Sequence, residues 1–165
     1  MKKIKYLLFF LFLFLISSEK IDNENQLFFD IGDILEIQFI KHGELSFMKK
    51  NFLLKKIDIE IASNDIEKMN GLMYRSFMNE NRGMLFILKK KEIQKMNIKN
   101  IRIPLDIIYI DESNTIIFIQ KYVSPMREIY SVNNLKLKYI LEINAGMSDR
   151  WGIKKEKTKI YLNKY

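Results

Sequence analysis

The chain contains no cysteine, and His42 is its single histidine. The absence of cysteine excludes disulfides, thiolate metal sites and thiol nucleophiles. With one histidine and no cysteine, a zinc site lacks its usual ligands, and no loop resembles a calcium or magnesium site. Glycine-rich phosphate loops, nucleophile elbows and dinucleotide-binding fingerprints are also missing. We therefore expect no metal and no other cofactor, and a fold that its core must hold alone.

Arginine is scarce, with five among the 28 basic residues. A formal charge of +8 can indicate a nucleic-acid partner. Three of these charges, however, lie at Lys2, Lys3 and Lys5 in an N-terminal leader, and the remainder carries +5. Abundant lysine, asparagine and isoleucine are typical of an AT-rich genome, and no cluster of arginines indicates base recognition. We therefore expect no nucleic-acid partner.

The N-terminus has the layout of a secretory signal peptide. A basic stretch, Met1 to Lys5, precedes an apolar run from Tyr6 to Ile16, and small and charged residues follow at Ser17 to Glu19. The run is shorter than the roughly 20 residues that a membrane-spanning helix needs. Because Ile16 is a poor fit for cleavage after Ser18, residues 1–18 are either a signal peptide or an uncleaved anchor.

This leader predicts an exported protein of the cell envelope, periplasmic or anchored in the membrane by an uncleaved signal. It is not expected to be a lipoprotein, because no cysteine can accept the lipid. The polar, acidic stretch that follows predicts a linker over residues 19–33, and residues 34–165 are expected to form a single domain.

Alternating and short apolar runs predict mostly strands in this domain. Ile57, Ile59 and Ile61 alternate with polar residues, which is typical of a half-buried strand. Other strands are expected at 34–40 and 44–48, paired around Lys41 to Gly43, and at 84–88, 93–101, 105–110, 115–122, 139–143 and 158–162.

One main helix is predicted after the strand that ends at Ile61. Ser63-Asn64-Asp65 supplies N-cap chemistry. Ile66, Met69, Met73 and Phe77 recur at spacings of three and four, which predicts an apolar, core-facing side. Gly71 marks close packing or the end of this helix. The whole pattern predicts an α+β fold: a small, mainly antiparallel, bent or barrel-like sheet with one main helix.

Several motifs occur in a fixed order along the domain. They are Gly71-Leu72-Met73-Tyr74-Arg75, Gly83-Met84-Leu85-Phe86, Lys99-Asn100, Ile103-Pro104-Leu105-Asp106 running on to Ile110, Leu141-Glu142-Ile143-Asn144-Ala145-Gly146 and Trp151-Gly152-Ile153. Together they resemble the domain of unknown function family 192 over about residues 55 to 162. The stretch Ile40 to Phe47 resembles the leader of Bacteroidetes-type members.

The chain departs from this family pattern at two places. Family members usually carry an aromatic pair that includes tryptophan before a Met-Lys-Asn-Thr motif, where this chain has Met96 and Asn97. A late Gly-Asp turn is replaced by Glu156-Lys157. The resemblance implies a fold more than an activity, because the family's activity is not established.

Three charged residues stand inside or beside apolar runs: Arg75, Asp106 and Glu142. A buried carboxylate without a partner is costly, so we expect ion pairs, with Arg75 and Lys99 as the cations. Three interpretations stay open. The residues form a structural ion-pair network, or Arg75, Lys99 and Asn100 line a cleft for an anionic or sugar-like ligand. Alternatively, Asp106 and Glu142 form a general acid–base pair.

These interpretations correspond to three functions. The first is a non-enzymatic binding or accessory module of the cell envelope. The second is an envelope hydrolase that acts on a glycan through Asp106 and Glu142, and the third is a purely structural domain that binds a protein. The expected partner is thus a small ligand, a glycan or an envelope protein, with membrane contact only through the N-terminal segment.

Overall fold

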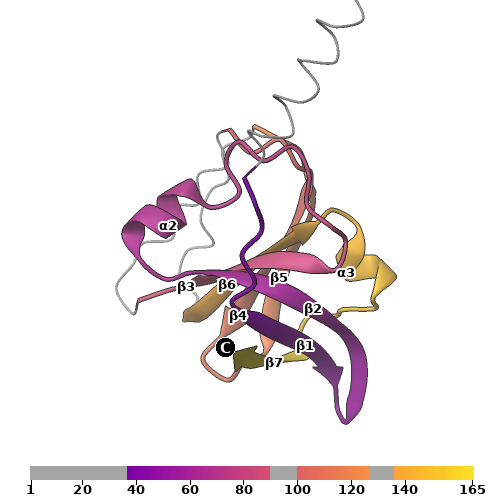
Figure 1. Cartoon of the computed structure of the whole chain (residues 1–165). Coiled ribbons are helices and arrows are strands. Elements are labelled where there is room, and N and C mark those ends of the chain that lie inside the picture. Colours follow the sequence, from indigo (N-terminus) through magenta and orange to yellow (C-terminus); the bar gives the residue numbers. More distant parts are fainter. Residues whose placement is uncertain (1–36, 90–99, 127–135) are drawn as a thin grey trace, which may run out of the picture. The chain divides into compact units, whose positions relative to one another are not determined.

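The structure is a computed structural model that describes residues 37–89, 100–126 and 136–165 (Figure 1). The predicted leader, the whole predicted linker, the first three residues of the predicted domain and the predicted strand at 93–101, apart from its last two residues, lie outside these ranges. Residues Gln38–Tyr165 form one compact unit. Its elements are β1 (Gly43–Lys49), β2 (Phe52–Ala62), α2 (Asp65–Asn70), β3 (Arg82–Ile87), β4 (Leu105–Asp111), β5 (Ile116–Val123), β6 (Leu137–Asn144), α3 (Met147–Arg150) and β7 (Lys159–Lys164).

The strands form one seven-stranded sheet in the order β5-β4-β6-β3-β2-β1-β7. Neighbouring strands are antiparallel except β2 and β3, which are parallel and are joined through α2. The two edge strands approach each other near one end, where Thr115 forms a bridge with Lys159. The sheet is therefore strongly bent without closing into a barrel, and the prediction of a bent, mainly antiparallel sheet is confirmed.

The helical part of the fold prediction is only roughly right, because the protein is mainly β. The helix α2 has six residues and α3 has four. Asn64 caps α2 as predicted, in a capping box in which its side chain accepts from Glu67 N at 2.9 Å. The helix ends at Gly71, whose φ of +43° is a conformation that side chains with a Cβ rarely adopt.

The predicted apolar side of the helix does not face the core. Ile66 and Met69 are each 69% exposed, and Phe77 is 70% exposed in the loop beyond the helix. Met73 is the exception, partly buried against the core, and Leu72, just past Gly71, is fully buried. The apolar residues do recur at spacings of three and four, but the helix ends at Gly71. Residues after Gly71 therefore do not extend the apolar side of the helix.

The expected hairpin between 34–40 and 44–48 is also wrong. The strand β1 pairs with β2 across the turn at Lys50 and Asn51, and on its other side with β7. Residues 37–40 form no strand. The predicted turn at Lys41 to Gly43 leads into β1, and His42 Nδ1 accepts a hydrogen bond from Ile61 N at 2.9 Å.

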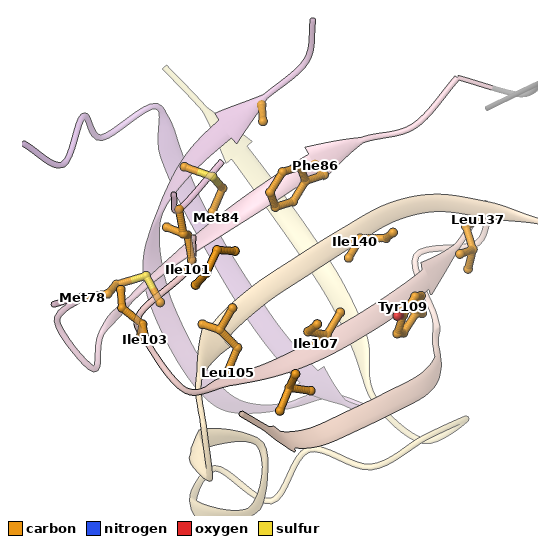
Figure 2. Packing of buried hydrophobic residues seen from close by; sticks show 13 residues of the cluster. Met78, Met84, Phe86, Ile101, Ile103, Leu105, Ile107, Tyr109, Leu137 and Ile140 are labelled. Carbon is orange, nitrogen blue, oxygen red and sulfur yellow. The ribbon is translucent and has the colours of Figure 1, made fainter. Parts of the chain in front are cut away.

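Both faces of the sheet are covered by buried apolar side chains. One cluster includes Leu45, Phe47, Ile57, Ile59, Leu85, Ile108, Leu141 and Ile143. The other includes Leu72, Met78, Met84, Phe86, Ile101, Ile103, Leu105, Ile107, Tyr109 and Ile140 (Figure 2). We call the sheet face that carries this second cluster the Tyr109 face. Since successive residues of a strand alternate between faces, the strand register decides which polar residues share it.

Candidate functional site

Two carboxylates lie on the Tyr109 face. The register places Glu60 of β2 opposite Met84 of β3, Met84 opposite Glu142 of β6, and Glu142 opposite Ile107 of β4. Directly opposed residues point to the same face, and neighbouring strands are about 4.8 Å apart. The backbones at Glu60 and Glu142 are therefore about 10 Å apart across β3. Both side chains are buried, with exposed fractions of 4% and 1%.

Arg75 forms an ion pair with Glu60. Its Nη1 lies 2.6 Å from Glu60 Oε2, and both side chains are buried. The other carboxylate oxygen of Glu60 accepts from Ile40 N at 2.8 Å. This pair fixes the loop after α2 to β2. The sequence predicted that Arg75 is partnered by a buried carboxylate, but its partner is Glu60 and neither Asp106 nor Glu142.

Glu142 has no cation beside it in the described part of the chain. Burial raises the pKa of its carboxyl from 4.5 to about 8, because an uncompensated charge is poorly solvated there. Burial, with a smaller contribution from the negative charge of Glu142, raises the pKa of the nearby Tyr109 to about 12. At neutral pH Glu142 is therefore mostly a neutral acid, able to donate as well as accept.

Four polar atoms of this face are shielded from solvent yet make no hydrogen bond among the described residues. They are Glu60 Oε2, Arg75 Nε, Tyr109 Oη and Glu142 Oε2. Glu60 Oε2 is nonetheless compensated by the ion pair with Arg75, whose Nη1 lies 2.6 Å away. Buried polar atoms in native proteins are almost always hydrogen-bonded, so the other three, all on one face, lack a polar partner within the described residues.

Asp106 belongs to a different arrangement on the opposite face. It stands opposite Ile143, one position away from the pair formed by Ile107 and Glu142. Its Oδ2 accepts from Ser148 N at 3.0 Å and from Ser148 Oγ at 2.6 Å, and its Oδ1 accepts from Tyr122 N at 2.9 Å. Asp106 is therefore a structural anchor for α3 and the end of β5.

We call Glu60, Arg75, Tyr109 and Glu142 the buried polar row. The remaining predicted site residues do not join this row. Asn100 is exposed, and its Nδ2 donates to Tyr74 Oη at 3.2 Å, while its carbonyl accepts from Tyr74 N at 2.9 Å. Lys99 lies outside the described residues. The structure thus places Arg75 and Glu142 on one face, Asp106 on the other, and Asn100 at the surface.

Sequence reasoning missed Glu60 and Tyr109. Glu60 alternates with Ile57 and Ile59, which is typical of a polar outer side, but the sheet is covered on both faces. Tyr109 is hidden in an apolar run, where its hydroxyl gives no periodic signal. Only the pairing of strands distant in the sequence brings these side chains toward Arg75 and Glu142.

Neither a metal-binding group nor a membrane-spanning helix occurs within residues 37–89, 100–126 and 136–165. In these ranges no three or more acidic or histidine side chains are grouped as a metal site requires. No helix there is long and apolar enough to cross a bilayer.

The fold and this face define a small, mainly β domain with an open seven-stranded sheet and a buried polar row. The chain belongs to the domain of unknown function family 192, described as "Uncharacterized ACR", whose profile matches residues 46–159. The predicted family is thus confirmed, while the Bacteroidetes-type detail stays a prediction. No curated protein matches the chain significantly.

Two solved structures have the same fold. A protein of Sinorhizobium meliloti 1021, described as a candidate transcription regulator, is 25% identical with a TM-score of 0.68, over 76% of this chain and 98% of that one. A protein of unknown function from Novosphingobium aromaticivorans DSM 12444 is also 25% identical, with a TM-score of 0.65, over 72% of this chain and 83% of that one.

Proposed function

We propose that the protein is an exported, non-enzymatic binding module of the cell envelope whose domain takes a neutral, hydroxyl-bearing ligand of sugar-like chemistry. One observation carries the binding part of this proposal: three buried polar atoms of the Tyr109 face, Arg75 Nε, Tyr109 Oη and Glu142 Oε2, that lack hydrogen-bond partners among the described residues. Each such atom costs about 1–3 kcal/mol when it stays unsatisfied. A ligand that hydrogen-bonds with them recovers this free energy on binding.

The charges of the row favour a neutral ligand over an anionic one. The charge of Arg75 is balanced by Glu60 at 2.6 Å. The raised pKa of Glu142, about 8, leaves that carboxyl mostly uncharged at pH 7. The row therefore offers a mixture of donors and acceptors with little net charge, which matches hydroxyl groups, since each hydroxyl donates and accepts.

Entry of the ligand requires part of the apolar cover to move. Leu72, Met78, Ile101 and Ile103 pack in the same cluster as Met84 and Ile107, and none of the four lies in a helix or strand. Figure 2 shows Met78, Ile101 and Ile103 beside Met84 at one end of the cluster. Segments outside regular elements open at a lower free energy than core strands, so this cover is the route we propose.

The geometry gives no support to the alternative of a glycan hydrolase. Glycosidases need two carboxyl groups that flank the same bond from within one cleft. Asp106 and Glu142 occupy neighbouring register positions on adjacent strands, so they point to opposite faces of the sheet. Asp106 is in addition held by Ser148 and Tyr122.

Binding can be tested by NMR titration of the full-length protein with N-acetylglucosamine and its β-1,4-linked dimer, with citrate as the anionic comparison. We expect the sugars to shift the Arg75 Nε–H resonance and Tyr109→Phe to weaken binding about tenfold. Tyr161→Phe, at a residue that is 59% exposed, is the matched control. Absence of sugar binding at millimolar concentration, or preferential binding of citrate, contradicts the proposal.

Export is supported by the basic stretch with Lys2, Lys3 and Lys5 followed by the apolar run to Ile16. Fractionation of cells is expected to place the protein in the periplasm or the membrane. Labelled palmitate is not expected to be incorporated, because the chain has no cysteine. A purely cytoplasmic pool of full-length protein contradicts export.

A further inference from the structure

The turn between β1 and β2 combines exposed apolar side chains with lysines. Phe52 is 75% exposed and Leu53 is 58% exposed. Four lysines surround them at positions 49, 50, 55 and 56, and no acidic residue lies between Glu44 and Asp58. We call residues 48–56 the β1–β2 tip. Figure 1 shows it projecting beyond the neighbouring strands, on the side of the domain away from α2.

The lysines of the tip divide into two groups. Lys56 Nζ donates to Glu44 Oε2 at 2.8 Å, and Lys55 makes a cation–π contact with Trp151, its Nζ 5.5 Å from the ring centroid. Lys49 and Lys50 are exposed and make no ion pair within the described residues. Lys49, which stands opposite Phe52 in the strand register, and Lys50 in the turn are therefore available for an external anionic surface.

We propose that the β1–β2 tip docks on an anionic lipid surface, with Phe52 and Leu53 entering the interface and Lys49 and Lys50 contacting lipid headgroups. Apolar side chains gain free energy by leaving water for the headgroup and acyl boundary, and basic side chains beside them are attracted by anionic lipids. Both kinds of residue occupy one short turn here. This contact is additional to the N-terminal segment and independent of the proposed ligand site.

The small apolar area and the lysines of the tip favour a membrane over a protein as its partner. A protein interface of stable size needs about 800 Å² on each partner, far more than two exposed apolar side chains supply. Lysine is also depleted in protein interfaces relative to the rest of the surface. A lipid surface, in contrast, needs only a small apolar tip with adjacent cations.

The test uses the full-length protein in lipid nanodiscs with a tryptophan at the tip. Phe52→Trp is compared with Phe77→Trp, a matched control at a residue that is 70% exposed elsewhere on the domain. The signal of Trp151 is subtracted with the unsubstituted protein. Nanodiscs of phosphatidylcholine alone are compared with nanodiscs that contain a quarter phosphatidylglycerol, with brominated acyl chains as quenchers.

We expect Phe52→Trp to show a blue shift and strong quenching only with phosphatidylglycerol, with both effects lost at high salt. Lys49→Gln with Lys50→Gln is expected to remove most of this quenching, whereas Lys155→Gln with Lys157→Gln, an exposed pair before β7, leaves it unchanged. Leu53→Trp repeats the measurement independently. Equal quenching at positions 52 and 77, quenching that ignores lipid charge, or none at all overturns the proposal.

Discussion

At the residue scale, the pair formed by Arg75 and Glu60 has the largest energetic consequence. Removal of one partner leaves the other as a buried, uncompensated charge, which typically costs about 3–5 kcal/mol. Arg75→Ala is therefore expected to destabilise strongly, and Arg75→Ala with Glu60→Ala to cost less than the sum of the single changes. Urea denaturation of the four proteins measures this coupling.

Two controls accompany that cycle. Arg150 and Glu80 are also 2.6 Å apart, but they are 60% and 61% exposed, so Arg150→Ala is expected to cost about 0.5 kcal/mol or less. Arg75→Ala with Asp106→Ala is expected to be additive, because the two side chains lie on opposite faces of the sheet. If the changes in the free energy of unfolding for Arg75→Ala and Glu60→Ala are additive, the ion pair is contradicted. If Arg75→Ala changes this free energy only slightly, a structural role for Arg75 is contradicted.

Glu142 makes stability depend on pH. The pKa of its carboxyl is raised from 4.5 in the ordinary case to about 8 in the folded protein. Between these values the native state binds more protons than the unfolded chain, so the free energy of unfolding falls as pH rises. One pKa unit corresponds to about 1.4 kcal/mol, so the loss amounts to a few kcal/mol by pH 9 and is absent below pH 4.5.

Glu142→Gln isolates this contribution because the amide does not ionise. We expect the variant to gain stability relative to the unsubstituted protein as pH rises from 5 to 9, measured by urea denaturation at each pH. Glu80→Gln, at an exposed position, controls for the loss of a carboxylate. A stability difference that stays constant over this range contradicts the raised pKa.

The sequence predicted the burial of Arg75, Asp106 and Glu142 correctly, since each stands in or beside an apolar run. It did not predict their partners. The partner of Arg75 lies on β2, and the position of Glu142 relative to Glu60 depends on two strand pairings, β2 with β3 and β3 with β6. Such pairings are non-local, and a shift of one residue in register reverses the face of every side chain.

At the element scale, α2 illustrates how a local pattern can mislead. Its capping residue and its end at Gly71 were predictable, because both depend on local chemistry. Its orientation was not, and Ile66 and Met69 face solvent. We expect Ile66→Ala to change stability by less than about 0.5 kcal/mol, and Leu72→Ala to cost about 2–5 kcal/mol, since only Leu72 is fully buried.

Thermal and urea denaturation of these two variants distinguish the observed packing from the predicted apolar side. If Ile66 packed against the core, Ile66→Ala would lower the free energy of unfolding by more than about 2 kcal/mol. Met69→Ala, at an equally exposed position, serves as a second measurement of the same expectation.

Asp106 determines the position of α3. This short helix has Gly146 at its N-cap and no side-chain cap of its own, so Asp106 supplies the acceptor for Ser148 N. Asp106→Asn replaces one acceptor oxygen with an NH₂ group. One of the donors, in buried Ser148 or at the part-buried Tyr122 N, is then left unpaired, which is expected to cost about 1–3 kcal/mol.

Hydrogen exchange of the Ser148 amide, together with urea denaturation, measures this effect. Asp149→Asn is the control, because Asp149 is on the same helix but its side chain is 48% exposed. Unchanged protection of Ser148 in Asp106→Asn contradicts the anchoring role.

At the scale of the whole molecule, strands that are distant in the sequence lie next to each other in the sheet. The strand β1 lies between β2 and β7, and β6 lies between β3 and β4. Pairs joined by short turns, such as β4 with β5, were predictable from turn residues between apolar runs. The insertion of β6 between β3 and β4 was not, because nothing local in the sequence records which distant strands pair.

This interleaved order predicts that residues 34–165 unfold as one cooperative unit. The C-terminal strand β7 covers the edge of β1, and Ile160 of β7 packs in the same cluster as Ile108 of β4 and Ile143 of β6. Loss of any one strand therefore exposes core that the others share.

We expect a single unfolding transition, coincident by circular dichroism and Trp151 fluorescence, with a midpoint that neither chelator nor reductant changes. The chain has no thiol to reduce, and its core is apolar on both faces of the sheet. Two separated transitions, or unfolding on addition of chelator, contradict this expectation.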